Sequence, residues 1–178
     1  MSDFKTLKGL YIKHVSSDPP SPIEGEIWYN TTSQTLKVAP QIAAWASGGN
    51  VNTARSQHGG AGTQTASLAF GGNPIVAINE SYDGSSWTES PDLSTARRLV
   101  GGCGTQTSAL CSGGIASPGT VNSTEEFDGS SWTAGGNYTA AAYGIGTGGT
   151  QTAAFGAGYA PYTANSAEYD GSSWTAGS

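Results

Sequence analysis

The phrase Asp-Gly-Ser-Ser-Trp occurs three times in this chain, and a fourth tryptophan stands one repeat upstream of the first phrase. These tryptophans are Trp45, Trp87, Trp132 and Trp174, with spacings of 42, 45 and 42 residues. A Thr-Gln-Thr triplet begins 18 residues after each of the first three. One tryptophan in each unit of about 45 residues is typical of stacked β-units, in a propeller or in an array. The repeat therefore predicts an all-β fold.

Each repeat carries signals for four short strands. Asp-Gly between aromatic residues favours a tight hairpin, because both turn residues tolerate a positive φ. Upstream of it, a short apolar run ends at Gly-Gly or Gly-Tyr, and one more strand precedes each Thr-Gln-Thr turn. The expected first strands are residues 58–62, 100–104 and 143–147, and the expected second strands are residues 66–70, 108–111 and 153–155.

Charge is scarce, and its distribution excludes one class of partner. Only 11% of the residues are charged, and the net charge of −6 falls on the repeats, because residues 1–45 carry equal numbers of acids and bases. Low charge with 27 glycines also occurs in disordered chains, but five Trp and eight Tyr in a regular period favour an ordered core. A negative surface without a basic stripe is unsuited to nucleic acid.

Apolar runs and cysteines give little sign of targeting or redox chemistry. Residues 1–30 lack the apolar run of a secretory signal, and no segment is long enough to span a membrane, so we expect synthesis in the cytoplasm and no membrane insertion. Cys103 and Cys111 correspond to Ala or Gly in the other repeats, which favours small-residue packing. Because they flank one turn, a cross-strand disulfide is the alternative.

A double glycine after an apolar strand, then Glu-x-aromatic, then a tryptophan five residues later is the pattern of kelch repeats. Residues 42–178 resemble a kelch-type β-propeller on these positions, except that the third unit has Gly158-Tyr159 in place of the double glycine. The resemblance implies four-stranded blades. The sialidase Asp-box also ends in Trp, but it places a residue between Asp and Gly, whereas the two are adjacent here, so no sialidase residue is carried over.

The blade count leaves one strand without a sheet. A propeller needs four to eight blades, whereas the sequence predicts three complete four-stranded units plus a lone outer strand near 42–46 that bears Trp45. Continuation of the chain past Ser178, which we favour, would close the ring. Closure between subunits and an open array are the alternatives.

The first forty residues are unlike the repeats. An arm and Pro-rich linker cover residues 1–22, and a β-hairpin module covers residues 23–41, with two short β-rich runs around Thr31-Thr32-Ser33-Gln34. The phrase Gly-x-Ile-Trp-Tyr-Asn-(x)5-Leu-Lys resembles a module near the particle-bound end of tailed-phage fibre and appendage proteins. Trp28 and Tyr29 are therefore the candidate residues for attachment or intersubunit contact. The alternative is a strand pair that caps the propeller.

Catalysis and cofactor binding are not expected. His14 and His58 lie in unlike contexts, and no metal-ligand spacing, nucleophile motif or phosphate loop is present. The acidic pairs before the tryptophans recur in every unit, which favours turn chemistry over a single catalytic site. The repeat tryptophans are expected in the core. The amides of the Thr-Gln-Thr turns, on Gln64, Gln106 and Gln151, are candidates for glycan contact, with a polar hairpin tip as the alternative.

Two functions from different classes fit these expectations. The first is a virion structural protein, in which residues 1–41 anchor a phage fibre or appendage to other virion proteins and the propeller stands outward for interaction with the host or the particle surface. The second is a carbohydrate-binding propeller adhesin that recognises host surface glycan. A propeller glycan hydrolase or lyase is a weaker third. The first two predict a symmetric homo-oligomer, with a trimer as one option.

Overall fold

The protein is all-β. The structure, a computed structural model, describes residues 12–20, 26–39 and 48–177, and every regular element in these ranges is a strand. The chain divides into two compact units, Met1–Ser47 and Gly48–Ser178. The division falls six residues after the boundary expected from sequence. The expected outer strand that bears Trp45 lies outside the described residues.

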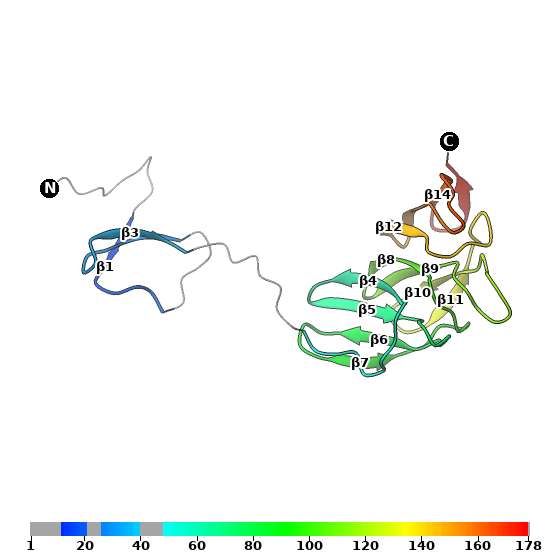
Figure 1. Ribbon diagram of the computed structural model, residues 1–178, viewed down its shortest axis with the longest axis horizontal. Coiled ribbons are helices and arrows are strands. Elements are labelled where there is room, and N and C mark those ends of the chain that lie inside the picture. Colours follow the sequence, from blue (N-terminus) through cyan, green and yellow to red (C-terminus); the bar gives the residue numbers. More distant parts are fainter. Residues whose placement is uncertain (1–11, 21–25, 40–47, 178) are drawn as a thin grey trace. The chain divides into compact units, whose positions relative to one another are not determined.

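The first unit contains a three-stranded sheet (Figure 1). The expected hairpin is present: β2 (Ile27–Asn30) and β3 (Thr35–Val38) pair antiparallel across a four-residue turn. The arm contributes a third strand, β1 (Lys13–Val15), which pairs parallel with β2. Arm and hairpin, which the sequence suggested as separate modules, therefore share one sheet.

The second unit contains three four-stranded antiparallel sheets, one for each repeat (Figure 1). The first sheet is β4 (Gly59–Thr63), β5 (Ala66–Phe70), β6 (Asn79–Tyr82) and β7 (Trp87–Ser90). The second is β8 (Gly101–Thr105), β9 (Ser108–Ser112), β10 (Thr124–Phe127) and β11 (Trp132–Gly135). The third is β12 (Gly146–Thr150), β13 (Ala153–Ala157), β14 (Ser166–Tyr169) and β15 (Trp174–Ala176).

The Asp-Gly turn differs from the expected two-residue hairpin. Tyr82 pairs with Trp87, so the loop contains all four residues of Asp-Gly-Ser-Ser. Only Gly84 has a positive φ, of 96°. The carboxylate of Asp83 accepts hydrogen bonds from the backbone N–H groups of Ser85 and Ser86, both at 2.8 Å. This side-chain turn explains why the serines recur with the Asp-Gly pair.

The three sheets form a fan. The backbones of the first strands β4, β8 and β12 lie close to one another in sequence order. The backbone of each outer strand, β7, β11 or β15, lies close only to its own sheet among the described strands (Figure 1). Two apolar clusters fill the spaces between neighbouring sheets. The described sheets form an open series rather than a closed ring.

Candidate functional site

Asp18 organises one face of the N-terminal sheet. Its Oδ1 accepts hydrogen bonds from Trp28 Nε1 at 2.9 Å and Asn30 Nδ2 at 2.7 Å, and its Oδ2 forms an ion pair with Lys37. Hydrogen bonds from Lys37, Asn30 and Trp28 lower the pKa of Asp18 to about 2. The segment before the hairpin is thus tied across this face. Trp28 and Asn30 are buried beneath it.

The opposite face of the same sheet is apolar and exposed. Cross-strand pairing places Ile27 opposite Val38 and Tyr29 opposite Leu36. Ile27, Leu36 and Val38 are 49%, 61% and 58% exposed. The ring of His14 lies beside that of Tyr29, with centroids 5.2 Å apart. We call Ile27, Tyr29, Leu36 and Val38 the apolar face.

The structure separates the two aromatic residues that the sequence suggested for attachment. Tyr29 belongs to the apolar face, but Trp28 is only 5% exposed and its indole N–H is bound to Asp18. Adjacent residues of a strand point to opposite faces, so this separation could have been read from the sequence. The same alternation would have identified Ile27, Leu36 and Val38 as the companions of Tyr29.

Two of the three rim glutamines are engaged inside the protein. Gln106 Nε2 donates to the carbonyl oxygens of Ser67 (3.3 Å) and Tyr82 (2.6 Å) in the preceding sheet. Gln151 Nε2 donates to the corresponding carbonyls of Ala109 (3.0 Å) and Phe127 (2.7 Å). These amides join neighbouring sheets and are not free for glycan. Gln64, at the same position of the first sheet, is exposed.

Five of the six recurring acids are engaged in local structure, whereas Glu168 is exposed. Hydrogen bonds from the following two serines lower the pKa of Asp83, Asp128 and Asp170 to about 2. Glu80 and Glu125 are buried and paired with Arg55 and Arg97, respectively.

In the Arg97–Glu125 pair, both carboxylate oxygens of the buried glutamate accept hydrogen bonds. Arg97 Nη2 donates to Glu125 Oε1 at 2.6 Å, while the N–H of Ser94 donates to Glu125 Oε2 at 2.7 Å. Arg97 Nη1 also donates to the carbonyl oxygen of Ser123 at 2.7 Å. A carboxylate bound in this way is a structural tie between loop and strand, and it is poorly placed to transfer a proton.

Cys103 and Cys111 are both free and buried. They sit on adjacent strands, but Cys103 lies in the apolar cluster between the second and third sheets and Cys111 in the cluster between the first and second. Their side chains therefore point to opposite faces, which rules out the disulfide alternative. Burial raises the pKa of Cys103 to about 11 and that of Cys111 to about 12, so both thiols stay protonated and unreactive at neutral pH.

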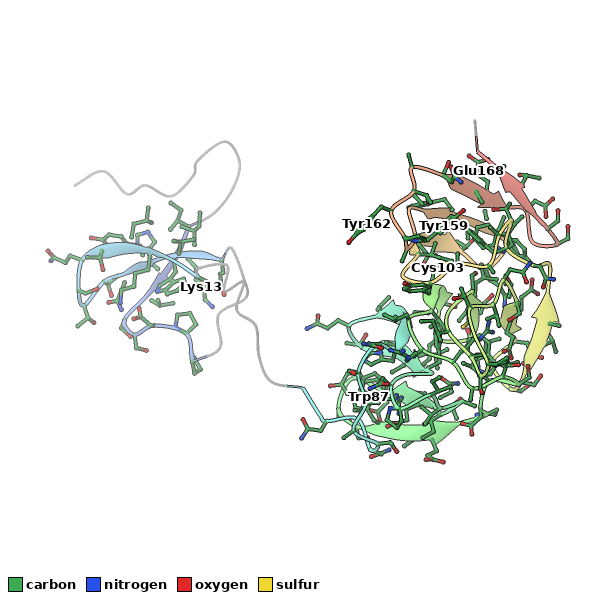
Figure 2. All side chains as sticks on the ribbon, turned by 45° about the vertical axis from the view of Figure 1, so that its right-hand side comes forward. Lys13, Trp87, Cys103, Tyr159, Tyr162 and Glu168 are labelled. Carbon is green, nitrogen blue, oxygen red and sulfur yellow. The ribbon has the colours of Figure 1, made fainter. Side chains whose placement is uncertain are left out.

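Two of the three repeat tryptophans within the described ranges take part in packing between sheets. Trp132 is 8% exposed and its ring meets that of Phe70 in the first sheet, with centroids 5.0 Å apart. Trp174 is 7% exposed and donates its indole N–H to Thr124 in the second sheet at 3.0 Å. Trp87 has no earlier described sheet to contact and is partly exposed (Figure 2).

Among the described residues, no group of three or more His, Cys, Asp or Glu side chains is arranged to hold a metal ion. Nor does any described helix have the length and hydropathy of a membrane span. No protein-family model matches the chain, and no curated protein matches it significantly.

Proposed function

We propose that the chain is a virion structural protein, a tailed-phage fibre or appendage component whose N-terminal unit anchors it while a kelch-like propeller region is displayed. The single observation that carries the proposal is the apolar face of the N-terminal sheet. Its four residues would be costly to leave in water, and a partner protein that covers them would hold the chain in place.

Two properties of the repeat unit support its role as a displayed head. Neighbouring sheets meet at their first strands and diverge outward, as the blades of a propeller do. The turns and rims are built from Ser, Thr, Asn and Gly, with few charges. Their aspartates are held in local hydrogen bonds. A stiff, weakly charged unit of this kind suits rigid display, with binding as its function and no turnover.

A glycan-binding adhesin receives less support than the structural role. The side-chain amides of Gln106 and Gln151 donate to carbonyl oxygens inside the protein, and only Gln64 of the three is exposed. A glycan array probed with the full chain tests this second function. Binding that Gln64→Ala abolishes would favour the adhesin.

The anchoring role is tested with particles of the phage that encodes the chain. Purified particles that lack the protein are incubated with the full chain or with Leu36→Lys, which places a charge in the apolar face. Thr88→Lys, an exposed position on β7, is the matched control. We expect co-sedimentation of wild type and control, and loss for Leu36→Lys. Absence of the chain from mature particles by mass spectrometry, or equal attachment of all three, would refute the proposal.

A further inference from the structure

The two interfaces between neighbouring sheets are built to one plan. The side of a sheet that meets the preceding sheet is called its front surface, and the side that meets the following sheet its back surface. The front surface contributes a glutamine amide and a tryptophan, which in the third sheet are Gln151 and Trp174. The back surface contributes a large apolar residue and carbonyl acceptors. Leu110 of the second sheet is this apolar residue at the second interface and is 1% exposed.

The front surface of the first sheet carries the same groups, and no described sheet packs against it. The chain entering the sheet contacts one of these groups, because the Trp87 indole N–H donates to the Gly49 carbonyl oxygen at 3.0 Å. Gln64 is exposed at the position of Gln106 and Gln151, and Trp87 is partly exposed at the position of Trp132 and Trp174. At the centre of this surface lies Ser67, partly exposed, where the later sheets have the buried residues Ala109 and Ala154. A front surface is thus present, and no described sheet is packed on it.

The back surface of the third sheet is also exposed, and it carries the groups that a front surface contacts in the internal interfaces. Phe155 occupies the position of Leu68 and Leu110, and it is 54% exposed whereas they are 2% and 1% exposed. Glu168 is also exposed on this sheet (Figure 2). It corresponds to Glu126 of the second sheet, which accepts a hydrogen bond from the Tyr169 hydroxyl of the third.

We infer that the back surface of the third sheet in one copy of the chain binds the front surface of the first sheet in a second copy. The internal interfaces specify the contacts. Glu168 would accept from the hydroxyl of Tyr82 in the second copy, as Glu126 accepts from Tyr169. Gln64 of the second copy would donate to the carbonyls of Ala154 and Tyr169, which are paired in register as Ala109 and Phe127 are.

The chemistry of the two surfaces fits this occupant. Phe155 presents an apolar ring to a surface centred on the small Ser67 side chain, and the Glu168 carboxylate meets the neutral hydroxyl of Tyr82. The contact is head-to-tail, because different surfaces of the two copies meet. The repeat units of two copies supply six described sheets, within the four to eight blades that closed rings use, so we expect a discrete dimer.

One segment borders the docking site. Gly48 lies against the Tyr82 hydroxyl, as Gly135 lies against that of Tyr169. The chain entering the first sheet therefore already occupies the outer edge of the front surface. The incoming sheet meets that surface mainly through β12, β13 and β14. We expect β15, the shortest of the outer strands in the repeats, to shift at this edge.

Sedimentation velocity of the full chain over a concentration series tests the inference with two variants. Phe155→Glu disrupts the back surface, and Ser67→Arg disrupts the front surface. Both positions are accessible in the single copy, so the fold is expected to survive, and circular dichroism checks it. Wild type should form a dimer, and each variant alone should weaken dimerisation by about 30-fold or more, the effect of losing one hot spot at an interface.

A mixture of the two variants distinguishes head-to-tail contact from symmetric contact. Phe155→Glu keeps an intact front surface and Ser67→Arg keeps an intact back surface, so the mixture should recover a one-to-one heterodimer. Two controls, Thr88→Lys on β7 and Leu36→Lys on the apolar face, should dimerise as wild type does. A monomeric wild type, dimers insensitive to both variants, or a mixture that fails to recover would each overturn the inference, whatever the fate of the virion proposal.

Discussion

In the first and second sheets a buried arginine and glutamate form an ion pair, whereas the third sheet has alanines at both positions. Arg97 and Glu125 correspond to Ala142 and Ala167, both 0% exposed. The register is unchanged, since Glu125 faces Cys111 as Ala167 faces Gly156. The second and third sheets therefore share one backbone arrangement but stabilise these two equivalent positions in different ways.

Tyr138 explains how the third sheet does without the ion pair. It stands where the second sheet has Leu93, is 2% exposed, and packs edge-on against Trp174 with ring centroids 4.8 Å apart. A side chain on Gly156 would collide with its ring, because an added Cβ lies 2.9 Å from Tyr138 Cε2. The larger tyrosine thus fills the volume that smaller neighbours leave. The repeat therefore requires that this buried volume be filled, but it does not require the arginine–glutamate ion pair.

The largest expected effect comes from breaking the pair on one side only. Arg97→Ala leaves Glu125 buried without its partner, which should lower the free energy of unfolding by about 3–5 kcal/mol. Urea unfolding followed by tryptophan fluorescence measures the loss. Arg98→Ala, next in the chain but with its guanidinium on the exposed Gln57, is the matched control and should change stability by less than about 0.5 kcal/mol. Similar losses for the two variants would contradict a structural role of the pair.

The second prediction concerns a variant in which the second sheet receives the buried residues of the third. The combined substitutions Leu93→Tyr, Arg97→Ala, Cys111→Gly and Glu125→Ala reproduce the residues of the third sheet at those positions. We expect this variant to regain most of the stability lost in Arg97→Ala, because it removes the stranded charge and fills the volume.

The control for that transfer is the double variant Arg97→Ala with Glu125→Ala, which removes both charges and fills nothing. The same urea experiment should rank it below the four-site variant. If the double variant proves as stable as the four-site variant, the tyrosine is not what compensates for the missing pair.

A smaller effect is expected from overfilling the third sheet. Gly156→Ala places a methyl group against Tyr138, and such overpacking costs about 1–3 kcal/mol. The cost should largely vanish in a Tyr138→Leu background, which a double-mutant cycle of unfolding free energies measures. Gly119→Ala, where an added Cβ meets nothing within 4 Å, is the control. An undiminished cost in the Tyr138→Leu background would place the strain elsewhere.

The repeated part of the fold was predictable because the residues that form the turns recur in the sequence of each unit. The Trp period and Thr-Gln-Thr turns led to the four strands per unit, and the second strand of the first sheet has the expected bounds, Ala66–Phe70. The third sheet begins at Gly146, three residues later than expected. Its stretch before Thr150 is rich in glycine, so no apolar side chain marks where the strand starts.

The candidate surfaces were less predictable, because they depend on which face a residue occupies and on contacts distant in sequence. Trp28 looked available until the Asp18 carboxylate, ten residues earlier, was found on its indole N–H. Gln106 and Gln151 looked like exposed turn tips, but fan packing brings carbonyls of the preceding sheet within reach. The buried Arg97–Glu125 pair spans 28 residues, and no local pattern reports such a contact.

The smallest expected effect concerns the feature that all three sheets share, the turn aspartates. Their folded pKa of about 2 lies below the ordinary aspartate value of 3.8, so their contribution to stability is present above about pH 4 and is lost as the pH falls toward 2. Asp128→Asn keeps an acceptor oxygen for the serine N–H groups but has no charge to lose. Its melting temperature should therefore fall less than that of wild type between pH 5 and pH 2.5.

Comparison among the sheets decides whether that interpretation is right. Asp83→Asn and Asp170→Asn should flatten the acid dependence as much as Asp128→Asn does, because the four hydrogen-bonded loop residues are the same in each sheet. Glu89→Gln, which removes an exposed carboxylate on β7, should leave the dependence unchanged. An effect confined to the two sheets that keep the ion pair would instead assign the acid sensitivity to Glu80 and Glu125, because the third sheet has an alanine at that position.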